Sequence, residues 1–154
     1  MIKQKEFILP TKKDTISLSQ RIAHIAKKGD VFALHGTLGM GKSVFARAFV
    51  QELCGVQDVP SPTFTLLQTY EAEDFDIYHF DLYRLKDPDE VFELGIEDAI
   101  YNGISLIEWP EKMGGYLPKD VFKVNIVPYS NGRKIIIQTL SDDKFFRLSS
   151  IGDF

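Results

Sequence analysis

The sequence predicts an α/β protein, a single three-layer domain over residues 1–154 whose mixed central sheet is extended by antiparallel strands. Three observations predict this class. An apolar strand pattern at 31–34 runs into a glycine-rich loop and then a helix. Two later apolar runs stop at Asp81 and Glu108, and polar ligands gather at the carboxyl ends of strands in such folds. Residues 121–140 alternate like an antiparallel hairpin.

Residues 36–43 match the phosphate-binding pattern Gly-x4-Gly-Lys-Ser/Thr. A loop that wraps a triphosphate turns its backbone N–H groups inward, and glycine reaches the required angles without a side-chain clash. Lys42 supplies a cation for the β and γ phosphates, and the Ser43 hydroxyl is placed to bind Mg²⁺. The loop therefore predicts a P-loop NTPase-like fold. Its candidate nucleotide-binding residues are Thr37, Leu38, Gly39, Met40, Gly41, Lys42, Ser43 and Val44.

The segments around this loop also fit the α/β pattern. Residues 6–9 predict a short strand, and residues 14–28 predict an amphipathic helix with basic residues and Gly29 at its close. After the loop, residues 43–53 carry apolar side chains at helical spacing, and Gly55 stands where this helix would end. The loop therefore delivers phosphates to the positive end of a helix.

A short motif before that first helix bears on the choice of base. Residues 11–14, Thr-Lys-Lys-Asp, look like the guanine-reading tetrapeptide of GTPases. We discount this interpretation, because the motif precedes the phosphate loop and no Asp-x-x-Gly element accompanies it. Thr11 is retained as a candidate nucleotide contact.

Residues 59–65 form a stiff segment, because two prolines stand one residue apart in it. Hydroxyl side chains follow at once. A solvated turn is the simpler interpretation. The segment also lies between the phosphate loop and the next acidic strand, where nucleotide-sensing switch loops occur, so Thr63 or Thr65 is a candidate contact to Mg²⁺ or the γ phosphate.

Two acids are candidates for metal binding and catalysis. Residues 65–71 and 76–83 predict a neighbouring pair of strands, and Asp81 lies near the end of the second. A carboxylate there can hold Mg²⁺ through water, as Walker-B acids do. Residues 104–110 present an apolar run that stops at Glu108, which is a second candidate for the metal and for ordering the attacking water. The sequence leaves their roles open. The predicted catalytic residues are Lys42, Asp81 and Glu108, and the predicted metal ligands are Ser43, Asp81 and Glu108.

Four nearby residues are better explained by structure than by chemistry. His79 is interpreted as a structural hydrogen-bonding residue, Trp109 as a packing anchor, Arg84 as one half of an exposed salt bridge, and Cys54 as a small buried hydrophobe.

The remaining elements follow from local signals. Residues 86–95 carry a capping acid, an early proline and a final glycine, which predicts a helix, and a second short helix is predicted at 96–101. Strands at 121–127 and 133–140 are joined by a segment whose Asn-Gly pair is a strong hairpin signal. The last residues are ambiguous.

Composition narrows the functional classes. The 154 residues include a single cysteine, so no internal disulfide forms and a reducing cytoplasm is the expected compartment. No run approaches the length of a membrane span. The formal net charge of −4 disfavours stand-alone binding to nucleic acid, which depends on neutralising phosphates. A nucleic acid would therefore be held by a partner.

Four segments together resemble the TsaE family, the small bacterial ATPases of tRNA threonylcarbamoyladenosine biosynthesis. They are the phosphate loop at 38–43, the proline-bound loop at 61–65, and the acidic strand ends at 79–85 and 107–111. The likeness covers nearly the whole chain in order. Departures are mild: Met40 stands where the family usually has alanine, Ser43 where it has threonine, and His35 and Thr37 where it often has acids.

The resemblance implies a function. It implies that Lys42, Ser43, Asp81 and Glu108 bind ATP and Mg²⁺ and carry hydrolysis, and that Arg133 touches the adenine end. It also implies that the protein works with the TsaB and TsaD proteins, which transfer the threonylcarbamoyl group to an adenosine beside the tRNA anticodon. Contact with tRNA would then be indirect, through that complex.

Two other functions stay open on the residues alone. A small P-loop kinase of a nucleoside or metabolite shares the loop, but such enzymes crowd arginines around the transferred phosphate and this chain has five in all. A nucleotide-sensing interaction module without meaningful turnover would also use a switch-like proline loop.

Overall fold

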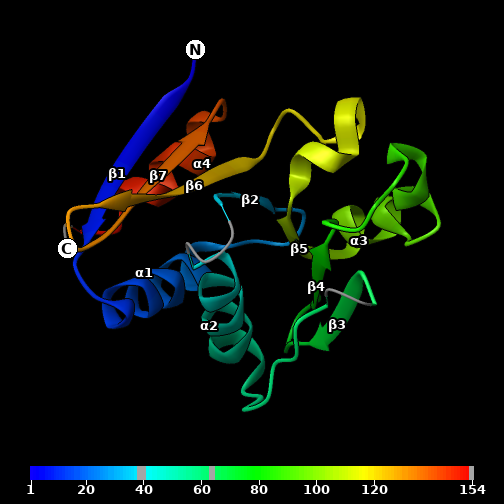
Figure 1. The fold of residues 1–154 in the computed structure, drawn as a ribbon, viewed down its shortest axis with the longest axis horizontal. Helices are drawn as coiled ribbons and strands as arrows, with labels where there is room; N and C mark the ends of the chain where they lie inside the picture. The colour runs from blue at the N-terminus through cyan, green and yellow to red at the C-terminus, as the bar shows by residue number, and fades with distance from the viewer. Residues whose placement is uncertain (38–40, 63–64, 153–154) are drawn as a thin grey trace.

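The fold is organised around a mixed β-sheet (Figure 1). A computed structural model describes residues 1–37, 41–62 and 65–152. In these residues seven strands lie in the order β1-β7-β6-β2-β5-β4-β3. Their bounds are β1 Lys3–Leu9, β2 Val31–His35, β3 Leu67–Glu71, β4 Asp76–Asp81, β5 Gly103–Glu108, β6 Phe122–Tyr129 and β7 Gly132–Thr139.

The four central strands are parallel and the outer pairs are antiparallel. β2 pairs in parallel with β5 and with β6, and β5 pairs in parallel with β4. β3–β4, β6–β7 and β1–β7 are antiparallel. Every residue of β5 is buried, because helices cover both faces of the central sheet. The predicted α/β class, with its antiparallel extension, is confirmed.

Helices form a layer on each face of the sheet. Their bounds are α1 Lys12–Ile25, α2 Lys42–Cys54, α3 Ile96–Asn102 and α4 Asp142–Ser149, with short 3₁₀ helices η1 Pro88–Phe92 and η2 Pro110–Tyr116. One core cluster joins α1, α2 and α4 to the strands and contains Phe32, Phe49 and Phe122. The other joins η1, α3 and η2 to the opposite face and contains Phe80 and Met113. Figure 1 shows α1 and α2 side by side below β6 and β2.

The first helix departs from its predicted bounds at both ends. It begins at Lys12 because Thr11 and Asp14 make a reciprocal capping box, which satisfies two free N–H groups of the first turn. It ends at Ile25, since Ala26 is already extended. The predicted close at residues 27–28 was therefore wrong.

The C-terminal hairpin is present, but its turn differs from the predicted one. Tyr129 pairs with Gly132, so the two turn residues are Ser130 and Asn131, and the positive φ lies at Ser130 (52°). Gly132 is needed elsewhere: a Cβ there would lie 2.4 Å from the carbonyl oxygen of Leu9 on β1. The Asn-Gly signal thus located the hairpin correctly, although the glycine serves the strand contact.

One further element differs from expectation, and two others complete the fold. The predicted helix at 86–95 is the 3₁₀ helix η1, capped by Asp87. The apolar run in 104–110 stops at Glu108, as predicted, because Trp109 adopts a left-handed backbone (φ 59°) that no strand continues through. The ambiguous C-terminus forms α4, and Arg147 on α4 pairs with buried Asp30 at 2.7 Å. None of the helices described is both long and apolar enough to cross a membrane.

Candidate nucleotide-binding site

The phosphate loop joins β2 to α2, as the sequence predicts. Gly36 follows β2 directly, and a Cβ there would lie 2.9 Å from the carbonyl oxygen of Ile126. Gly41 caps α2 with a left-handed φ of 103°, which glycine adopts at little cost. Four predicted contacts, Leu38, Gly39, Met40 and Thr63, lie outside the described residues. Thr65 is exposed, and its hydroxyl accepts a hydrogen bond from the Gln68 side chain at 3.2 Å.

Lys42 begins α2 and is almost fully buried, with 5% of its surface exposed. Its ammonium lies 3.6 Å from the centre of the Trp109 ring, a cation–π contact. Burial lowers the pKa of Lys42, while the charges of Glu108, Glu111 and Asp81 oppose that shift. The predicted phosphate-binding cation therefore sits among carboxylates at the helix N-terminus.

The two predicted acids lie side by side. In the parallel pairing of β4 with β5, Asp81 is directly opposite Glu108, so both strands end at the same edge. Both residues are buried. The Ser43 hydroxyl donates to Glu108 Oε1 over 3.5 Å, whereas Asp81 Oδ1 accepts the backbone N–H of Tyr83 at 3.1 Å. Of the two carboxylates, Glu108 is thus the one in contact with the predicted metal-binding hydroxyl.

These side chains suit Mg²⁺ held together with phosphates. Within the described residues, no group of three or more His, Cys, Asp and Glu side chains could hold a metal ion by itself. Mg²⁺ prefers oxygen ligands and is usually bound through one or two carboxylates, substrate phosphates and water. The hydroxyl of Ser43 and the carboxylate of Glu108 provide such oxygens at the start of α2.

Arg133 reaches the end of the phosphate loop. A Cβ on Gly41 would lie 3.3 Å from Arg133 Nε, so the arginine packs against the loop where α2 begins. Its Nε is buried without a hydrogen-bond partner among the described residues. Thr11 instead caps α1, donating to Asp14 Oδ2 at 2.8 Å. Leu9, the last residue of β1 and two residues before Thr11, pairs with Arg133 on β7. Thr11 and Arg133 therefore lie near each other.

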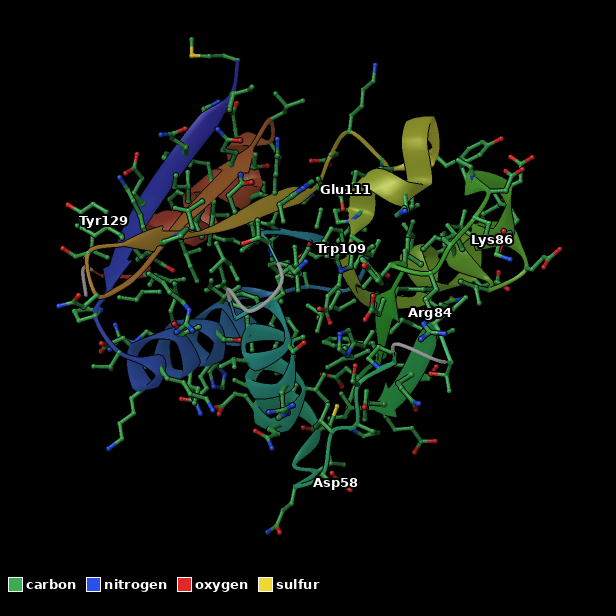
Figure 2. All side chains as sticks on the ribbon, in the orientation of Figure 1. Asp58, Arg84, Lys86, Trp109, Glu111 and Tyr129 are labelled. Atoms are coloured by element: carbon green, nitrogen blue, oxygen red, sulfur yellow. The ribbon has the colours of Figure 1, made fainter. Side chains whose placement is uncertain are left out.

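Reasoning from sequence missed three contributors to this site. Trp109 was interpreted as a packing anchor, and it packs against Tyr83 at 5.0 Å but also holds Lys42. Glu111 contributes charge near Lys42 and lies 3.4 Å from His35, whose pKa is lowered chiefly by burial. Figure 2 shows Trp109 and Glu111 near the centre of the molecule. The sequence signal that could have indicated them was their position one and three residues after Glu108, where β5 ends.

His79 is the third. The interpretation of His79 as a structural hydrogen-bonding residue is confirmed, but its partner is a predicted catalytic residue: Nε2 lies 2.7 Å from Glu108 Oε2. His79 stands two residues before Asp81, so both side chains face the same side of β4. That two-residue spacing was the sequence signal.

The strand-loop-helix unit and the paired acids at adjacent strand ends define an α/β protein of the P-loop NTPase-like class. The sequence matches the family described as "Threonylcarbamoyl adenosine biosynthesis protein TsaE" over residues 9–135. This chain belongs to the TsaE family, as the four motifs predicted.

Similar proteins agree with this assignment. The tRNA threonylcarbamoyladenosine biosynthesis protein TsaE of Rickettsia conorii is 38% identical over 95% of this chain and 84% of its own length. The protein of that name from Haemophilus influenzae is 43% identical over 71% of this chain and 70% of its own length. The crystal structure of Bacillus subtilis YdiB superposes with a TM-score of 0.79 at 26% identity, covering 97% of this chain and 95% of that one.

Proposed function

We propose that this chain binds Mg-ATP at residues 36–43 and hydrolyses it as the ATPase subunit of the threonylcarbamoyladenosine machinery. The contact between the Ser43 hydroxyl and Glu108 Oε1, at the N-terminus of α2, carries this proposal. It joins a metal-binding hydroxyl to a buried carboxylate beside the loop that would wrap the triphosphate.

Each side chain has a distinct role in the proposed reaction. Lys42 would bind the β and γ phosphates, and Ser43 would hold Mg²⁺, which would supply positive charge against the phosphates. Glu108 orients the attacking water for in-line attack on the γ phosphorus and receives its proton. Asp81, opposite Glu108 at the adjacent strand end, would help to hold the metal. The bond between the γ phosphorus and the bridging oxygen breaks, which gives ADP and phosphate.

The fold also supports ATP over GTP. In the guanine-reading interpretation of residues 11–14, the carboxylate of Asp14 would accept hydrogen bonds from the base. Instead, Asp14 Oδ2 accepts from the backbone N–H and the hydroxyl of Thr11, at 2.9 and 2.8 Å, and caps α1. Arg133 packs on Gly41 at the start of α2, and we assign it the contact with the adenine end that the family resemblance implies.

The charge distribution supports contact with partner proteins, with tRNA engaged only indirectly. Residues 86–101 contain six acids and one lysine, a net charge of −5 against −4 for the whole chain. This acidic surface would repel a nucleic acid backbone. We therefore extend the proposal to TsaB and TsaD, the partners that the family resemblance implies.

Calorimetry and a hydrolysis assay test the proposal. ATP should bind in preference to GTP, and adding TsaB and TsaD should change the hydrolysis rate. Glu108→Ala should abolish hydrolysis and spare ATP binding, while Glu73→Ala, at an exposed acid outside the site, should change neither. Rates that stay the same in every sample would favour the nucleotide-sensing module, and ATP-dependent phosphorylation of a small acceptor would favour the kinase.

A further inference from the structure

We propose that His79 is a positioning residue for ATP hydrolysis, which holds Glu108 so that its second oxygen faces Ser43. This inference rests on the proposed ATPase function and adds a residue to it. His79 itself does not contact the nucleotide, because Glu108 lies between it and the Ser43 hydroxyl.

The geometry divides the Glu108 carboxylate between two neighbours. Oε2 lies 2.7 Å from His79 Nε2, and Oε1 lies 3.5 Å from the Ser43 hydroxyl. The side chains of His79 and Glu108 are only 3% and 4% exposed, so water does not compete for the hydrogen bond. A glutamate has three rotatable torsions, and fixing one oxygen limits the directions in which the other points.

The surroundings of the imidazole assign its tautomer. His79 Nδ1 is buried without a hydrogen-bond partner among the described residues. A proton on Nδ1 would be an unsatisfied buried donor, which is more costly than an unused lone pair. The hydrogen bond to Glu108 is therefore donated by Nε2. Both oxygens of Glu108 then act as acceptors. Oε1 faces Ser43, the side on which Mg²⁺ and the attacking water would bind.

A hydrogen bond that orients a metal ligand or a general base affects metal affinity and catalytic rate. Partners that orient a metal-site carboxylate or histidine affect activity by about 10- to 100-fold when they are removed. The strand register gives His79 this role, because the backbone of β4 pairs with β5 through residues that include both His79 and Asp81. The imidazole is thus anchored in the same sheet as the acid that it orients.

Two substitutions separate the hydrogen bond from simple packing. His79→Phe keeps a ring of similar size without the donor, and His79→Gln keeps an N–H donor at a comparable reach. In the presence of TsaB and TsaD, we expect His79→Phe to lower kcat about 10- to 100-fold while KM for ATP stays within about twofold. His79→Gln should recover most of that loss.

A matched control and a double variant complete the test. Ser105→Ala, at a fully buried residue of β5 whose hydroxyl has no described partner, should leave kcat unchanged. Because Glu108→Ala spares ATP binding, adding His79→Phe to it should leave the Kd for ATP unchanged, since the group to be oriented is gone.

Three results would overturn the inference. An unchanged kcat in His79→Phe, or equal losses in the Phe and Gln variants, would leave only a packing role. A weaker ATP affinity when His79→Phe is added to Glu108→Ala would show that His79 acts elsewhere. If the wild type binds ATP and hydrolyses none with its partners, the proposed function fails together with this role. A normal wild-type rate beside an unaffected His79→Phe removes the role of His79 alone.

Discussion

Replacing Lys42 with alanine is expected to weaken Mg-ATP binding by more than tenfold. A charge-assisted contact to phosphate contributes about 1.5 to 3 kcal/mol, and the loop lysine serves two phosphates. In the structure the ammonium lies 3.6 Å from the centre of the Trp109 ring. Moving to the phosphates breaks this cation–π contact, which offsets the gain in binding free energy by about 0.5 to 2 kcal/mol. Taken at the middle of these ranges, the difference is roughly 3 kcal/mol, which corresponds to about a 150-fold change in Kd.

Titration calorimetry measures this change, with Lys12→Ala, at an exposed lysine, as the control. Trp109 is the only tryptophan, so its fluorescence gives a second readout. Emission from the wild type should change when ATP draws the ammonium from the ring, and the Lys42→Ala protein should lack that change. Circular dichroism checks that the variant is folded. Equal affinities of a folded variant and the wild type would refute the reasoning.

Three further predictions concern stability and reactivity. Arg147→Met should lower the free energy of unfolding by about 3 kcal/mol in urea titrations, because it leaves Asp30 buried without its ionic partner, and a loss below about 1 kcal/mol would contradict this. Burial lowers the pKa of His35 below 6.5, so the unfolded chain binds that proton more readily and stability should fall as pH drops through the window below 6.5. His35→Asn should flatten that part of the stability profile, and an identical slope would exclude His35 as its source. Burial raises the pKa of Cys54 to about 11, so a thiol reagent at pH 8 should react far more slowly with the native protein than with the urea-unfolded chain, and equal rates would contradict it.

The loop and its acids were predictable because their chemistry is local. Glycines, a lysine and a hydroxyl at fixed spacing describe a loop and helix start wherever they occur, and an apolar run that stops at a carboxylate marks a strand end. Which acid meets Ser43 depends on the pairing of β4 with β5 and on where α2 packs. Those contacts join residues far apart in the chain, so no local pattern distinguishes Asp81 from Glu108.

The position of Trp109 was beyond sequence reasoning for another physical reason. The end of the strand at Glu108 was predicted, but a bulky aromatic residue rarely adopts a positive φ, so no local signal indicated the left-handed backbone of Trp109. Here the left-handed turn at Trp109 ends β5 directly after Glu108, and the ring lies against Lys42. Strained backbone of this kind persists where surrounding contacts determine it, often beside a functional site.

Strand alternation explains why β4 carries both core and site residues. Phe80 faces the cluster formed with η1, α3 and η2, while Ile77 faces the cluster formed with α1 and α2. His79 and Asp81 follow Ile77 at two-residue steps, so they share the side on which α2 begins. The alternation was readable from sequence, but the face that would meet α2 was not.

A shift of one residue in the pairing would turn His79 and Asp81 to the opposite face, away from Ser43, and bring Phe80 to the side of the phosphate loop. The buried aliphatic and aromatic residues that fix this register therefore also fix the position of the proposed catalytic acids.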